Sequence, residues 1–84
     1  MITQLWEWGV LRDDRNRPVG MCATKHAAME ALAKALIAGG CPARGQVGQV
    51  TLVRPVQAEP AHIREHPDRI AVYDGSAISW TRLP

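Results

Sequence analysis

The sequence contains no phenylalanine, only one tyrosine and two cysteines, and no long apolar run. No stretch approaches the ~18 apolar residues that a membrane-spanning helix needs, so we expect no membrane partner. The opening segment Met1 to Trp8 carries Glu7 and lacks the basic start of a secretory signal. Two cysteines without such a signal favour a reduced, cytoplasmic protein, although a bridge between Cys22 and Cys41 stays open.

Neither sign of charge is in large excess, because ten Lys and Arg residues stand against eight Asp and Glu residues, for a net charge of +2. Strong nucleic-acid binders usually carry a denser basic patch and an isoelectric point above about 9, whereas the value here is about 8.8. The 46% hydrophobic and 21% charged composition is that of a globular chain rather than a disordered tail. A length of 84 residues predicts a single domain over residues 1–84.

The first third of the chain has the pattern of a β-hairpin. Trp6 and Trp8 alternate with polar or small residues, which predicts a strand over Gln4–Leu11. Asp13–Arg17 is a polar turn, and a second alternating strand is expected over Pro18–Ala23. The two indoles should therefore lie on one face of the sheet.

A helix follows the hairpin. Thr24 is a suitable N-cap before a run of strong helix formers, and Gly39 and Gly40 supply the left-handed residue that ends a helix. The apolar stripe, with Met29 at its edge, should pack on the sheet. Its predicted members are Ala28, Leu32, Ala35 and Leu36.

The second half of the chain predicts three more strands. The third strand is expected over Val47–Val56, with an irregularity near Gly48. Gln57–Arg69 is polar and contains two prolines, so we predict a long connection there. A closing hairpin is expected from Ile70–Asp74 and Ala77–Arg82.

Two loop lengths are compatible with the closing hairpin. A two-residue loop pairs Val72 with Ala77 and Ile70 with Ser79. A three-residue loop over Asp74–Ser76 instead pairs Val72 with Ile78 and Ile70 with Trp80. We favour the three-residue loop, because it gathers four apolar side chains on one face and the buried pattern sets the register.

The elements together have the order ββαβββ. The simplest architecture is an α+β fold in which one mostly antiparallel sheet carries a single helix on one face. A β-grasp-like arrangement has this element order, but the order of the strands in the sheet is left open.

No recognisable catalytic motif is present. Gly39-Gly40 follows the predicted helix instead of preceding it, so it is not a phosphate-binding loop. GxSxG, HExxH and CxxC do not occur. Cys22 and His26 form at most a dyad without a third group to orient them. We therefore expect no enzymatic activity and no cofactor.

Cysteine and histidine occur at spacings that suit a metal site. The candidate ligands are Cys22, His26, Cys41, His62 and His66. The first two are four residues apart, as are the last two, and zinc is commonly held by such side chains. Against this, Cys22 falls in a predicted strand, and prolines flank the second pair. A small zinc-binding domain is the second alternative.

Basic residues gather around the predicted turn of the first hairpin. The candidate phosphate-binding residues are Arg12, Arg15, Arg17 and Lys25. A basic β-hairpin can enter a groove or follow phosphates, whereas Asp13 and Asp14 partly neutralise this turn. The segment from Trp6 to Ala38 also resembles the arm-type DNA-binding domain of tyrosine recombinases, although that family places three strands before its helix and two are predicted here. A nucleic-acid-binding module that uses the 12–17 hairpin is the first alternative.

Protein binding is the function that we predict first. A small antiparallel sheet leaves two edges that can pair with another chain. Leu5 and Leu11 fall on the face opposite the two indoles, so that face should be partly apolar. We therefore predict a small non-catalytic binding module that acts through a protein partner or through self-association as a homodimer.

Overall fold

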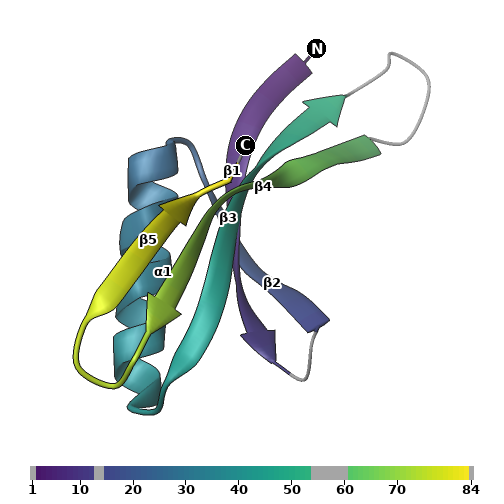
Figure 1. The fold of residues 1–84 in the computed structure, drawn as a ribbon. Coiled ribbons are helices and arrows are strands. Elements are labelled where there is room, and N and C mark those ends of the chain that lie inside the picture. The colour runs from purple at the N-terminus through teal and green to yellow at the C-terminus, as the bar shows by residue number, and fades with distance from the viewer. Residues whose placement is uncertain (1, 13–14, 54–60, 84) are drawn as a thin grey trace.

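The computed structural model describes residues 2–12, 15–53 and 61–83. Its elements are β1 (Ile2–Arg12), β2 (Arg15–Cys22), α1 (Lys25–Gly39), β3 (Ala43–Val53), β4 (Ala61–Tyr73) and β5 (Ile78–Arg82). The strands form one antiparallel sheet in the order β2-β1-β3-β4-β5, and α1 packs across one of its faces (Figure 1). The predicted α+β class and ββαβββ order are confirmed. Within the described ranges, no helix has the length and apolar character to cross a membrane.

The helix forms as its sequence predicts. The Oγ1 atom of Thr24 accepts a hydrogen bond of 3.1 Å from the backbone N–H of Ala27, which satisfies one of the free N–H groups of the first turn. At the other end, Gly40 has a φ of 73° and its N–H donates to the carbonyl of Ile37. Of the predicted apolar stripe, three members are buried: Ala28, Leu32 and Leu36.

The core lies between α1 and the sheet. Side chains from all five strands take part in this core, and the sheet contributes Trp6, Trp8, Val10, Cys22, Ala43, Val47, Ala71, Tyr73, Ile78 and Trp80. The two indoles of β1 share this face, as the alternation predicted. α1 approaches β3 so closely that a Cβ on Gly45 would overlap Leu32 Cδ1. The core therefore depends on a glycine in β3.

The predicted five-residue turn of the first hairpin is wrong. Arg12 pairs with Arg15, and β2 therefore includes Arg15 to Arg17. Strand pairing satisfies backbone N–H and C=O groups whatever the polarity of the side chains, so a polar run at a sheet edge can continue a strand. Only Asp13 and Asp14 remain between the strands, and they lie outside the described residues.

The predicted connection over residues 57–69 is wrong from Ala61 onward, where β4 begins. Gln57 to Pro60 lie outside the described residues. The β3–β4 pairing shifts register at Gly48, which pairs with Pro67, and this confirms the predicted irregularity. Proline is tolerated at such irregular points of a ladder, which is why the strand passes through Pro67.

The closing hairpin has a four-residue loop, so both registers considered for it are wrong. Tyr73 pairs with Ile78, and Ala71 pairs with Trp80. The Asp74 carboxylate stabilises the longer loop, because its Oδ1 accepts hydrogen bonds from the backbone N–H of Ser76 at 2.7 Å and of Ala77 at 2.8 Å. The observed register directs these four apolar side chains towards α1 and leaves Ile70 and Val72 on the opposite face.

Candidate functional site

The side of the sheet opposite α1 has no helix over it, and we call it the helix-free face. The β1–β3 pairing is uninterrupted from Ile2–Val53 to Leu11–Arg44, so alternate residues of both strands belong to this face. Its described apolar side chains are Leu5, Leu11, Met21, Val50, Leu52, Ile70 and Val72. The sequence had indicated only the first two of them.

Burial on the helix-free face differs from one part of the face to another, and Arg44 of the central strand β3 is exposed. Val50 and Leu52 of β3 are 1% and 8% exposed, whereas Met21 of β2 and Val72 of β4 are 40% and 39% exposed. Figure 1 shows how strongly the sheet twists, with the β1–β2 hairpin and the β4–β5 hairpin pointing in different directions. The exposed apolar side chains described on this face are therefore Met21, on the edge strand β2, and Val72, which pairs with Arg44 near the start of β3.

Sequence reasoning missed both exposed residues, Met21 and Val72. The wrong register for the β4–β5 hairpin placed Val72 on the face of the sheet that contacts α1. The signal that identifies Val72 as outward is Tyr73, a large aromatic neighbour that is 8% exposed and takes the inward position. Adjacent residues in a strand point to opposite faces, so only one of the two can contact α1.

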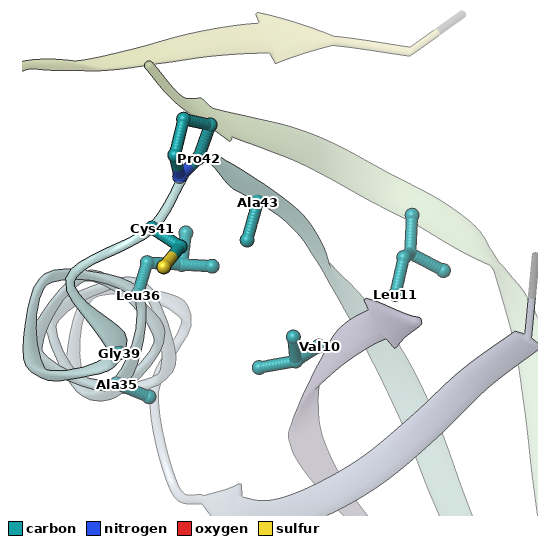
Figure 2. A pocket seen from close by; sticks show the side chains of 8 residues that line it. All are labelled: Val10, Leu11, Ala35, Leu36, Gly39, Cys41, Pro42 and Ala43. Atoms are coloured by element: carbon teal, nitrogen blue, oxygen red, sulfur yellow. The ribbon is translucent and has the colours of Figure 1, made fainter. Parts of the chain in front are cut away.

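A groove of about 510 Å³ opens where α1 ends. Figure 2 shows its lining: Val10, Leu11, Ala35, Leu36, Gly39, Cys41, Pro42 and Ala43. A second hollow of about 370 Å³ adjoins it, shares Leu11, Pro42 and Ala43, and extends to Arg44, Val72, Tyr73 and Asp74. The two hollows together lead from the end of the helix onto the helix-free face.

Asp74, at the rim of the second hollow, has a carboxylate that is held in its charged form. Its pKa is lowered, first by the N–H of Ala77 and then by the N–H of Ser76, because both donate hydrogen bonds to the carboxylate. The side chain is fully exposed to solvent. Its role in the fold is to close the β4–β5 loop.

The start of α1 is tied to β4 by a small charged cluster. The Lys25 ammonium lies 5.5 Å from the centre of the Trp6 ring and 3.5 Å from Asp68 Oδ2. Arg69 Nη1 lies 2.8 Å from the same oxygen. Two cations thus share one carboxylate, and Lys25 is engaged within the fold.

The structure separates the residues predicted to bind nucleic acid. Lys25 follows the end of β2, whereas Arg15 begins it, and an eight-residue strand spans about 26 Å. The register pairs Arg12 with Arg15 and Val10 with Arg17. These three arginine positions therefore belong to one face of the hairpin, while their side chains lie outside what the structure describes.

The two cysteines lie near opposite ends of α1. Cys22 ends β2 before the helix begins, and Cys41 follows the C-cap. A helix of 15 residues is about 22 Å long, which is far beyond the Cα separation that a disulfide bridges. Both thiols are free.

Of the three histidines, only His26 has a described side chain, and it does not join the cysteines in a metal-binding cluster. His26 lies at the start of α1 with Nε2 3.1 Å from Glu30 Oε1, and its side chain is 84% exposed. His62 and His66 lie in β4, where their side chains are outside the described set. Among the residues whose side chains are described, no three His, Cys, Asp or Glu side chains lie close enough to hold a metal ion. The zinc site stays a prediction without geometric support.

The fold defines a small α+β domain in which α1 covers one face of the sheet and no described helix lies over the other. No protein-family model matches the chain, and no curated protein and no solved structure matches it. The function is therefore argued from the surfaces of the domain itself.

Proposed function

We propose that this domain is a protein-binding module whose contact surface is the helix-free face. The observation that carries the proposal is the exposure of two large apolar side chains there, Met21 and Val72, beside the half-buried Leu5, Leu11 and Ile70. Burying apolar surface is favourable by roughly 25 cal/mol per Å². A partner that covers this face would therefore be held by the hydrophobic effect.

The small number of charged residues on the helix-free face favours a mainly apolar partner. Among the residues of this face whose side chains are described, the charged ones are Glu7, which is 9% exposed, and the exposed Arg44. Arg64 pairs with Val50 and so also belongs to this face. The two arginine positions are six residues of β3 apart, so they form no dense charged patch for a strongly charged ligand. The free thiols of Cys22 and Cys41 are consistent with work in a reducing, cytoplasmic compartment.

Site-specific photo-crosslinking in the cell of origin tests the proposal. A photoreactive amino acid at position 72 should give a discrete covalent adduct with a partner protein. The same group at position 37 is the matched control, because Ile37 is also apolar and 55% exposed but lies on α1. Adducts that are absent at position 72, or equal at both positions, would overturn the proposal.

A second candidate function is nucleic-acid binding by the β1–β2 hairpin. The register between β1 and β2 favours this function. Arg12 and Arg15 are direct cross-strand partners, and like charges in this position repel one another. A phosphate between them would offset that repulsion. Three such contacts would make the affinity depend steeply on salt.

Salt titrations with duplex DNA test this candidate. Replacing Arg12, Arg15 and Arg17 with Ala should reduce the slope of log affinity against log salt by about 2–3. Lys25→Ala should leave the slope unchanged, because Lys25 lies at the other end of β2 and contacts Asp68. Absence of binding at about 50 mM salt would exclude the candidate, since electrostatic binding is strongest at low salt.

A further inference from the structure

We infer that the partner bound beside Val72 is a peptide segment that places an apolar side chain in the two adjoining hollows and a carboxylate on Arg44. This inference rests on the proposed function and specifies the chemistry of the partner. Three features of the described residues carry it: the position of Arg44 in the sheet, its lack of a partner, and the open shape of the hollows.

Arg44 lies between the apolar side chains that the partner would cover. It pairs with Leu11 of β1 and with Val72 of β4, and residues directly opposite one another in a sheet have Cβ atoms about 5 Å apart. Val72 is 39% exposed, and Arg44 is exposed as well. A partner that buries Val72 must therefore also remove water from the Arg44 guanidinium.

The guanidinium of Arg44 requires an anion from that partner. Among the described residues, Arg44 has no hydrogen-bond or ion-pair partner. Burying an unpaired charge is costly, whereas a carboxylate can accept two parallel hydrogen bonds from a guanidinium. The Asp74 carboxylate lines the same hollow, but its Oδ1 already accepts hydrogen bonds from two backbone N–H groups of its own loop. The charge that is left to match is positive, so the segment carries Asp or Glu.

The shape of the hollows fits a peptide side chain better than a small molecule. Small-molecule pockets enclose most of the ligand surface, whereas both hollows here are open to solvent. The larger one, of about 510 Å³, joins the other through Leu11, Pro42 and Ala43 (Figure 2). A peptide segment can lay one large apolar side chain in such a groove. Because Arg44 directly follows Ala43, the acidic residue of the segment should lie within about three residues of the apolar one.

Selection from a random peptide library displayed on phage tests the inference on the purified full chain. Peptides enriched on the wild-type protein should share a large apolar residue with Asp or Glu close to it. Arg44→Glu should reverse this preference to Lys or Arg, because it reverses the charge at the rim. Arg82→Glu is the matched control: Arg82 is also an exposed strand arginine but lines neither hollow, so the preference should stay acidic.

A second measurement fills the groove itself. Ala35 lines the larger hollow, so Ala35→Trp should weaken binding of a selected peptide at least tenfold. Ile37→Trp, at an exposed position of the same helix, should leave the affinity unchanged. The bound peptide should also slow alkylation of Cys41, whose free thiol lines the groove. Circular dichroism checks that every variant is folded.

Three outcomes would overturn the inference. The first is a selection that enriches no peptides beyond those retained by Ala35→Trp. The second is enriched sequences whose charge does not follow the charge at position 44. The third is protection of Cys41 by dimerisation of the chain alone, which would indicate a second copy as the occupant.

The crosslinking experiment separates this inference from the proposed function. If position 72 gives a discrete adduct in the cell but the selected peptides lack the acidic residue, the inference fails and the proposed function stands. If peptides of the expected pattern bind while position 72 gives no adduct, the proposed function fails and the peptide site stands.

Discussion

At the scale of single residues, Gly45 determines how closely the helix approaches the sheet. A Cβ at this position would overlap Leu32 Cδ1 and lie 2.9 Å from the carbonyl oxygen of Gly9. We predict that Gly45→Ala destabilises the protein by about 1–3 kcal/mol, the usual cost of overpacking a core. Urea unfolding, followed by circular dichroism, measures the change.

Gly39→Ala is the matched control for this prediction. A Cβ there would meet nothing within 4 Å, and Gly39 is the last residue of α1. Alanine is favoured over glycine in a helix by up to about 1 kcal/mol, so this variant should be neutral or slightly more stable. Equal destabilisation by the two substitutions would contradict the close packing at Gly45.

Asp74 makes a pH-dependent contribution to stability. Hydrogen bonds from the N–H groups of Ala77 and Ser76 lower its pKa in the folded state. A lowered pKa means that the stabilisation is present above the unfolded value of about 3.9 and is lost as pH falls through the lower folded pKa. Asp74→Asn removes the titrating group.

The measurement is the difference in Tm between wild type and Asp74→Asn at several pH values. We expect wild type to be the more stable at neutral pH, and the difference to shrink as pH falls below about 4. A difference that stays constant over this range would show that the charge of Asp74 does not stabilise the loop.

At the scale of elements, α1 forms one side of the core through three buried side chains, Ala28, Leu32 and Leu36. Leu32 is 0% exposed and lies between Ala28 and Leu36 on the buried stripe. Leu32→Ala should reduce the free energy of unfolding by about 2–5 kcal/mol, because it leaves a cavity between helix and sheet. This is a large share of the stability of so small a domain.

The control for this element is Ile37→Ala. Ile37 belongs to the same helix but is 55% exposed, so its truncation should change stability by less than about 1 kcal/mol. Chemical denaturation of both variants gives the comparison. A Leu32→Ala variant that unfolds at the wild-type midpoint would mean that α1 does not cover the sheet through this stripe.

At the scale of the whole molecule, α1 covers one face of the five-stranded sheet, and no described helix covers the other. If a peptide segment binds the folded chain beside Val72, binding and folding are linked. A selected peptide at about a hundred times its Kd stabilises the folded state by roughly 2.7 kcal/mol, so Tm should rise by roughly ten degrees in a domain of this size. The Tm of Val72→Lys should not respond to the peptide, whereas that of Ile37→Lys should follow the wild type. Differential scanning calorimetry provides the test.

The sequence by itself determined the elements that depend on local interactions. The helix was predictable because Thr24, the run of helix formers and Gly40 act within a few residues of one another. The inward position of Trp6 and Trp8 followed from simple alternation. The apolar character of the helix-free face was foreseen in part, through Leu5 and Leu11.

Only the tertiary structure decided the strand order, the extent of β2 and β4, and the closing register. Each depends on how one strand pairs with another rather than on the pattern within a strand: Gly48 pairs with Pro67, Arg12 with Arg15, and Ala71 with Trp80. A shift of one residue reverses every side chain of a strand. For that reason the outward position of Val72, on which the proposed interface depends, follows from the pairing of β4 with β3 and β5.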